Sequence, residues 1–468
     1  MRHIPPEIWG IIIQHACVFD HDPLDTSQDP SFLQSKPTLP TTYRAEMNIK
    51  LALSLVSKQW NSLTRPFLYE FIWIGRAMHA KLLSRTLLME FVNCSGSSGK
   101  YLRRLHIETP ALERCSPADL RTILDYAPHL FIFADQRSVQ RSLIDAVSDP
   151  KCGPEEILQL VAHPKVRRLS WTRYDDAPFQ LVMAPLENNI ATHLEYLELF
   201  SWLPQCDALF AEPLGRGDGA SIEMNVQLPS LRALKIALDD DALAVLASWR
   251  MPSLTHVSVL SGDFNCPGAG FARFFRAHGG RLRQLELGHS PTRASELYLT
   301  PPPQYTRIPP TPPPLATWCP NLREFICSAD AEWHWHWQAP DWIAPHVLLP
   351  SHPTVELIAI RDIDIRLRDD PHVFEGGETA GGAYFLLCEQ MSVLLRRDAF
   401  PNLRFVRDVS AESHLMRTIR PAERVTQFWT TVLRRCQERG IWMEDYHGVN
   451  IALRNLRQAS LGQNETPE

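Results

Sequence analysis

This sequence lacks the short motifs by which most enzymes are recognised. It contains no phosphate-binding loop, no dinucleotide fingerprint, no Gly-x-Ser-x-Gly elbow and no His-Glu-x-x-His pair. Its ten cysteines form no Cys-x-x-Cys pair, and none has a histidine at metal-finger spacing. This distribution favours buried reduced thiols over disulfides or zinc sites. We therefore expect no catalytic residues, no cofactor and no metal site in this chain.

Long apolar runs and strong charge are also absent. No stretch approaches the roughly 18 apolar residues of a membrane span, and the apolar run 8–13 is too short for a signal peptide. The net charge is -6, from 47 basic and 53 acidic residues, and basic residues gather only in short doublets. A nucleic-acid binder usually carries a basic face. We therefore expect an intracellular protein, in the cytoplasm or the nucleus, that binds neither membranes nor nucleic acids.

The N-terminal residues predict two short amphipathic helices. Pro5 and Pro6 suit the first turn of a helix, and Glu7 suits the positive end of its dipole. Helical spacing then places four apolar residues on one face, namely Ile8, Ile11, Ile12 and Ala16. A second set of apolar residues follows the same spacing, namely Leu53, Val56, Trp60, Leu63 and Phe67. Pro66 is expected to end this second helix. Two such helices bury little by themselves, so their apolar faces need the rest of the chain or another protein.

These helices carry two sequence elements of a known docking module. The first is Ile4-Pro5-Pro6-Glu7-Ile8, and the second is Val56-Ser57-Lys58-Gln59-Trp60. In this order they resemble the F-box, in its fungal F-box-like form, by which substrate receptors dock on the Skp adaptor of cullin-RING ubiquitin ligases. Ser57 stands where the F-box usually has cysteine. The resemblance implies an F-box-like domain over residues 1–75, with an adaptor-binding surface that comprises Ile4, Pro5, Pro6, Ile8, Ile11, Leu53, Val56, Trp60 and Leu68.

An insert separates the two elements. It spans residues 20–42 and is rich in Asp, Pro, Ser and Thr, a composition typical of a solvated loop. An ordinary helical hairpin that caps a repeat array is the alternative interpretation of these N-terminal helices.

A short motif recurs along the rest of the chain. It starts with an apolar residue, usually Leu or Val, and ends in an alternation of apolar and polar residues that is typical of a strand. Ten copies begin at Leu102, Leu130, Val166, Leu194, Leu231, Leu254, Leu282, Leu322, Val355 and Leu403, separated by 23 to 48 residues. Proline often stands two residues before a copy and ends the preceding helix. A period of this length predicts a solenoid.

The expected fold class is therefore α/β, with a small helical module followed by a solenoid of parallel strands inside and helices outside. The repeats resemble degenerate leucine-rich repeats over residues 76–420, without a regular Asn ladder. A non-repeat α/β domain is the alternative. Residues 421–457 predict a C-terminal capping helix, because apolar residues follow helical spacing over 422–439, and residues 458–468 predict a disordered tail.

Two segments interrupt the repeats. The Pro-rich stretch 300–314 predicts an exposed polyproline loop, and its use as a ligand of a proline-binding module stays open. The run Trp333-His334-Trp335-His336-Trp337, followed by Trp342, supplies aromatic side chains either for packing the insertion or for binding a substrate. The residues considered for substrate binding are therefore Trp333, Trp335, Trp337 and Trp342.

Together these features predict a substrate-recognition adaptor of a cullin-RING ubiquitin ligase. Its N-terminal module would dock on the Skp adaptor, and through it on a cullin, while the repeats hold an unidentified protein substrate. A leucine-rich-repeat interaction scaffold that never enters a ligase is the alternative. The two hypotheses differ in whether the N-terminal apolar face binds the adaptor.

Overall fold

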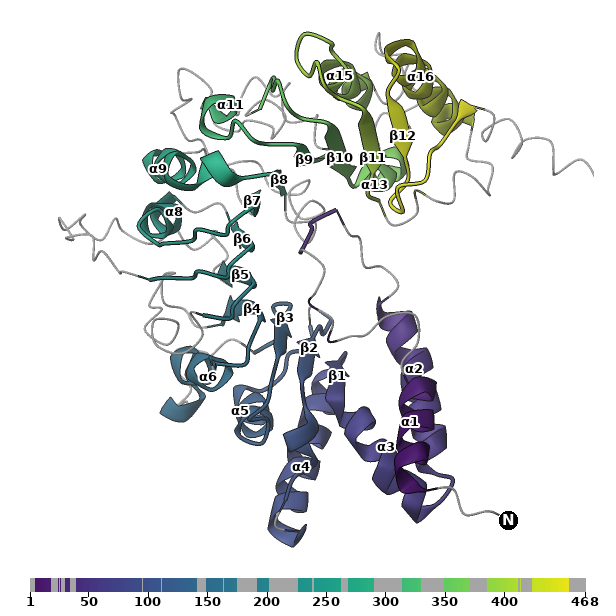
Figure 1. Cartoon of the computed structure of the whole chain (residues 1–468), viewed down its shortest axis with the longest axis vertical. Coiled ribbons are helices and arrows are strands. Elements are labelled where there is room, and N and C mark those ends of the chain that lie inside the picture. Colours follow the sequence, from purple (N-terminus) through teal and green to yellow (C-terminus); the bar gives the residue numbers. More distant parts are fainter. Residues whose placement is uncertain are drawn as a thin grey trace, which may run out of the picture. The chain divides into compact units, whose positions relative to one another are not determined.

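The chain folds into an α/β structure built on parallel strands (Figure 1). The computed structural model describes residues 5–17, 24, 26, 30–33, 39–94, 96–110, 112–140, 149–162, 164–174, 192–201, 226–237, 240–261, 268–289, 314–329, 349–369, 385–410, 413 and 423–453. Within these ranges the strands form a 12-stranded sheet in the order β1 to β12, so neighbours in sequence are also neighbours in the sheet. Parallel neighbours need crossover connections, and among the described residues α5 lies between β2 and β3, α6 between β3 and β4, and α9 between β7 and β8. The predicted α/β class is confirmed at this level.

The first of two compact units contains residues 1–30, 37–234 and 248–253. Its helices are α1 (Pro6–Cys17), α2 (Leu39–Ser54), α3 (Lys58–Glu70), α4 (Ala77–Cys94), α5 (Pro117–Asp125) and α6 (Pro154–Val161), with short 3-10 turns η1 (Ser98–Tyr101) and η2 (Pro150–Cys152). Its strands are β1 (Phe71–Ile74), β2 (Arg104–Ile107), β3 (Ile132–Asp135), β4 (Arg168–Arg173) and β5 (Tyr196–Ser201). Strand β6 (Ala233–Ala237) has residues in both units.

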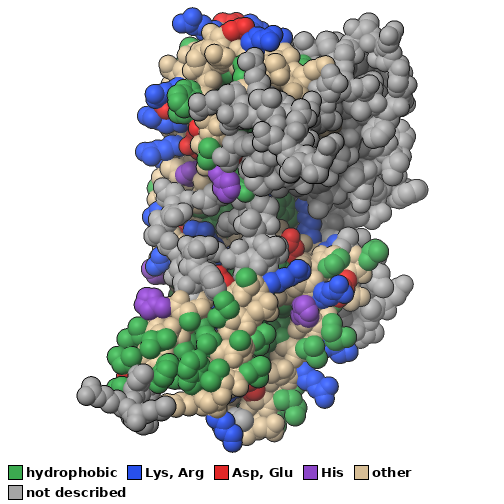
Figure 2. Space-filling view, turned by 90° about the vertical axis from the view of Figure 1, so that its right-hand side faces the viewer, with side chains coloured by type: hydrophobic (Ala, Val, Ile, Leu, Met, Phe, Trp, Pro, Cys, Tyr) green, Lys and Arg blue, Asp and Glu red, His purple; other side chains and the backbone are tan. Residues whose placement is uncertain are grey.

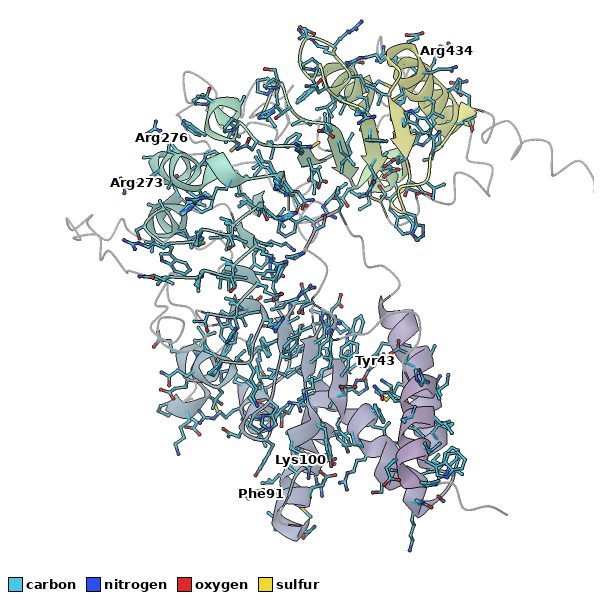
Figure 3. All side chains as sticks on the ribbon, viewed as in Figure 1. Tyr43, Phe91, Lys100, Arg273, Arg276 and Arg434 are labelled. Atoms are coloured by element: carbon cyan, nitrogen blue, oxygen red, sulfur yellow. The ribbon has the colours of Figure 1, made fainter. Side chains whose placement is uncertain are left out.

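The second unit contains residues 31–36, 235–247 and 254–468. Its helices are α8 (Asp240–Leu246), α9 (Ala269–His278), η4 (Gly279–Arg281), α11 (Leu315–Trp318), α13 (Ile363–Asp369), α15 (Phe385–Leu394) and α16 (Glu423–Arg439). Its strands are β7 (His256–Ser261), β8 (Gln284–His289), β9 (Glu324–Ser328), β10 (Leu357–Arg361), β11 (Phe405–Asp408) and β12 (Trp442–Glu444). Arg273 and Arg276 extend from α9 away from the strands (Figure 3).

The recurring motif builds the core. Every one of its ten copies contains a strand, from β2 to β11, as predicted. The first and fourth positions of each copy are at most 6% exposed: Leu102, Leu105, Leu130, Phe133, Val166, Leu169, Leu194, Leu197, Leu231, Leu234, Leu254, Val257, Leu282, Leu285, Leu322, Phe325, Val355, Ile358, Leu403 and Val406. Burial of each such side chain contributes about 1.5–3 kcal/mol. The periodic leucines therefore supply much of the stability of the fold.

Three elements were not predicted. Strand β1 pairs with β2, with Phe71 opposite Arg104, although residues 71–74 do not carry the motif. Helix α4 follows β1, so the first strand–helix pair of the solenoid-like region comes directly after the N-terminal helices. At the other end, Trp442 belongs to β12, which pairs with β11. Helix α16 covers nearly the predicted range, and the chain beyond it adds another strand.

The expectation that Pro66 ends a helix is wrong. The chain instead breaks before α3, where the Ser57 hydroxyl caps the new helix by accepting a hydrogen bond from the Trp60 N–H at 3.1 Å. Helix α3 continues through Pro66 and packs on η1 and β1. Arg65 reinforces this packing by donating to the Ser98 hydroxyl at 2.7 Å. These contacts compensate for the N–H that proline lacks.

The prediction of a solvated insert is also wrong for its described residues. Thr26, Phe32 and Leu33 are only 7%, 7% and 9% exposed. The last residues of the insert belong to α2, which already begins at Leu39. Composition predicted a polar loop, but side chains far away in the sequence bind this segment, as described below.

Candidate interaction surfaces

The N-terminal module, α1 to α3, has a small interior of its own. Trp9 on α1 packs against Trp60 on α3, with ring centroids 4.9 Å apart. On the inner side of α1, Ile13 and Cys17 are buried. Burial raises the pKa of the Cys17 thiol, which therefore stays protonated. The module is thus a packed helical unit rather than a set of separate helices.

Aromatic side chains join this module to the sheet. Tyr43 extends from α2 toward β1 (Figure 3), where its ring centroid lies 5.0 Å from that of Phe71 and 5.8 Å from that of Trp73. Burial raises the pKa of the Tyr43 hydroxyl, although a backbone hydrogen bond with Trp73 opposes this shift. Such aromatic contacts are stabilising beyond the area that they bury. They fix the helices on the first strand of the first unit.

The outer side of the N-terminal module is apolar. On α1, the exposed fractions of Ile8, Ile11 and Ile12 are 45%, 51% and 45%. At the turn between α2 and α3, those of Leu55 and Val56 are 84% and 61%. Hydrophobic side chains gather over the lower part of the view in Figure 2, where the N-terminal helices lie. Exposed apolar side chains that gather in this way typically mark an interaction site. We call these five residues the N-terminal apolar surface.

The residues predicted to bind the adaptor divide into three groups. Exposed are Pro5, Ile8, Ile11 and Val56, while Leu53, Trp60 and Leu68 are half-buried. Ile4 and the side chain of Pro6 lie outside the described residues. The contact between Trp60 and Trp9 means that Trp60 stabilises the module from inside.

The strands of the second unit carry polar side chains on the face opposite to the motif leucines. On β8, Gln284 and Glu286 alternate with the buried Leu285 and Leu287. The Ser258 hydroxyl on β7 donates a hydrogen bond to Glu286 at 2.6 Å, and Arg361 on β10 forms an ion pair with the same carboxylate. We call Gln284, Glu286 and Arg361 the strand-face site.

A segment of the insert occupies the strand-face site. The Phe32 N–H donates to Gln284 Oε1 at 2.7 Å, and Arg361 donates to the Phe32 carbonyl. Gln284 Nε2 donates to the Ser31 hydroxyl at 2.9 Å. The sequence analysis missed this site. Alternation along residues 284–287 predicts that Gln284 and Glu286 share one face, but no local signal connects them to residues 31–33.

A second polar region lies in the first unit, at the ends where strands β2 to β5 begin. A cavity of about 440 Å³ there is lined by Leu24, Arg103, His129, Phe131, Pro164, Lys165, Arg167 and His193. Arg167 donates to Glu195 Oε1 at 3.1 Å and to the Thr26 hydroxyl at 3.4 Å. Arg167 therefore joins the start of β5 to residue 26 of the insert.

Two buried carboxyl groups have strongly raised pKa values. Asp135 ends β3 and Asp408 ends β11, and burial raises the pKa of each to about 7. Asp135 accepts a hydrogen bond from the Ser138 N–H at 2.8 Å, and Asp408 accepts one from the Ser410 N–H at 2.9 Å. These bonds oppose the rise and hold the turns that follow the strands. The carboxyl groups of Asp135 and Asp408 therefore stabilise the turns that follow β3 and β11.

The four tryptophans considered for substrate binding, Trp333, Trp335, Trp337 and Trp342, lie outside the described residues, as does most of the Pro-rich stretch 300–314. In the part of the chain that the structure describes, no helix is both long and apolar enough to cross a membrane. No protein-family model matches the sequence, and neither does any curated protein.

Proposed function

We propose that this chain is the substrate receptor of a cullin-RING ubiquitin ligase. Its N-terminal module would dock on a Skp-family adaptor through the N-terminal apolar surface, and its leucine-rich-repeat-like strands and helices would hold the substrate. Ubiquitin transfer would be performed by partner subunits. Holding the substrate beside a charged ubiquitin carrier raises its effective concentration and requires no chemistry from this chain.

The observation that carries this proposal is the exposure of the N-terminal apolar surface. Single exposed apolar side chains are normal, but here five of them, at Ile8, Ile11, Ile12, Leu55 and Val56, come from one small module. Partner contacts would remove them from water, at about 25 cal/mol for each Å² of apolar surface. The resemblance of residues 4–8 and 56–60 to the F-box gives the chemistry of the partner: a protein with a complementary apolar groove.

Binding to the Skp adaptor tests the docking step. The full chain is compared with the double variant Ile11→Asp and Val56→Asp, whose exposed positions accept charge without loss of the interior. Two charges in a buried apolar interface are expected to weaken adaptor binding by about 30-fold or more. Leu112→Asp is the matched control, because Leu112 is 102% exposed and lies outside the module.

The outcomes separate the two classes of protein. Binding that is lost in the double variant and kept in Leu112→Asp supports the ligase receptor. Wild-type binding that the double variant retains refutes docking through this surface. Absence of adaptor binding by the folded wild-type chain favours a repeat scaffold that binds a partner outside any ligase.

A further inference from the structure

The strand-face site holds a turn, residues 31–33, largely by its backbone. Both polar backbone groups of Phe32 are bound, the N–H by Gln284 and the carbonyl by Arg361. The Ser31 hydroxyl receives a hydrogen bond from Gln284 and itself accepts one from the Leu33 N–H at 3.2 Å. Contacts to backbone groups do not depend on the bound side chain, so a segment of another protein is able to make them.

The polar groups of the site are fixed in place by their own neighbours. Gln284 has no solvent exposure, and its amide also donates to Glu324 on β9. Glu286 is 2% exposed and is held by Ser258 and Arg361. A buried polar side chain that loses its partner is destabilised by about 1–3 kcal/mol. With residues 31–33 in place, each polar group of the site therefore has a partner, and removing the segment would leave Gln284 Oε1 and the Arg361 guanidinium without one of theirs.

An apolar row lies next to these polar groups. The register places Ile326 opposite Glu286, and Ala359 opposite Ile326, on the face that carries Glu286. Ile326 and Ala359 point to the face opposite to the motif leucines, yet both are fully buried. Phe32 and Leu33 are 7% and 9% exposed, so the bound segment contributes apolar surface as well as backbone. The site thus matches a hydroxyl residue followed by an aromatic residue and leucine.

We propose that the strand-face site is a peptide-binding site for a Ser/Thr-aromatic-Leu turn of a partner protein, and that residues 31–33 of this chain occupy it as an internal competitor. That the partner is a ligase substrate rests on the proposed function. Peptide binding itself does not, and its test uses no adaptor. Failure of one proposal is therefore distinguishable from failure of the other.

The affinity of a free peptide measures this competition. The probe is a fluorescent peptide of residues 28–36, Gln-Asp-Pro-Ser-Phe-Leu-Gln-Ser-Lys, and its polarisation is followed with the full chain and with its Phe32→Asp variant. An attached segment has an effective concentration on the order of millimolar. The wild-type chain is therefore expected to bind the peptide about 10- to 100-fold more weakly than the Phe32→Asp chain.

Two controls tie the binding to the site. In the Phe32→Asp background, Arg361→Ala is expected to weaken peptide binding about tenfold or more, because the bound carbonyl loses its donor. A peptide with aspartate in place of phenylalanine is expected not to bind. Equal affinity of the wild-type and Phe32→Asp chains, or no effect of Arg361→Ala, would overturn the proposal.

Hydrogen exchange in the wild-type chain covers the case in which Phe32→Asp fails to fold. The Phe32 amide donates to Gln284 and should exchange slowly. Excess peptide is expected to accelerate its exchange by displacing the segment. Unchanged exchange at millimolar peptide would mean that residues 31–33 are a permanent part of the fold.

Discussion

Asp240 offers a sharp test of how one repeat is joined to the next. It is the first residue of α8, yet its carboxylate lies at the start of α9. Oδ1 accepts hydrogen bonds from the N–H groups of Gly268 at 3.0 Å and Phe271 at 2.8 Å, and Oδ2 accepts one from Gly270 at 2.9 Å. N–H groups in the first turn of a helix have no partner within it. One carboxylate therefore caps the helix of the following repeat.

The magnitude follows from these bonds. Loss of a helix N-cap costs about 0.5–2 kcal/mol, and loss of a negative charge at a helix N-terminus costs about 0.3–1 kcal/mol. Because two of the three bonds are partly buried, we expect Asp240→Ala to destabilise α9 by about 2 kcal/mol. Asp240→Asn keeps an acceptor oxygen without the charge, so we expect about half of that loss.

Substitution of Gly270 perturbs the same contact between α8 and α9. A Cβ at this position would lie 1.8 Å from the backbone oxygen of Asp240, so Gly270→Ala requires the two helices to separate. We expect it to destabilise α9 at least as much as Asp240→Ala, although alanine favours helices by about 1 kcal/mol over glycine. A stabilising effect would contradict the observed close approach.

Hydrogen exchange of the α9 amides is the appropriate assay, because a chain of 468 residues need not unfold in one step. A loss of about 2 kcal/mol corresponds to about 30-fold faster exchange. Glu156→Ala is the matched control, since Glu156 is an exposed acid in the first turn of α6, which has no side-chain cap bond at its N-cap. Unchanged α9 exchange in Asp240→Ala, or an equal change in α6 of Glu156→Ala, would refute the reasoning.

Two further predictions concern buried titratable groups. Because the folded chain raises the pKa of Asp135 from 3.8 to about 7, its contribution to stability is present below about pH 4 and is lost as the pH rises through about 7. Asp135→Asn should therefore slow the hydrogen exchange of the β3 amides more at pH 8 than at pH 5, after correction for the intrinsic pH dependence of exchange, by about 3 kcal/mol for the roughly two pKa units between pH 5 and pH 7; an equal effect at both pH values would contradict this. Burial raises the pKa of Cys319 to about 12 and also raises that of the less buried Cys152, so the native chain should alkylate the half-buried Cys152 before the buried Cys319, as peptide mass spectrometry would show. Faster labelling of Cys319 than of Cys152 would show that α11 opens readily.

The sequence predicted the N-terminal apolar surface only in part. Helical spacing placed Ile8, Ile11 and Ile12 on one face, and all three are exposed. It did not reveal that Ile13 turns inward, because the three consecutive isoleucines Ile11 to Ile13 allow more than one inner face. For Trp60, the motif indicated a partner contact, whereas its ring packs on Trp9. A short helix encodes its amphipathic faces, but the packing of its neighbours decides which face is covered.

The sequence by itself determined the repeating architecture, because each copy of the motif places its leucines in the core by local alternation and by its own turn signals. The tertiary structure alone decided where the insert lies. Phe32 and Gln284 are 252 positions apart, and the composition around Phe32 predicted a solvated loop. A contact of this kind depends on buried polar groups that the folded strands bring together. No local pattern of either segment encodes it.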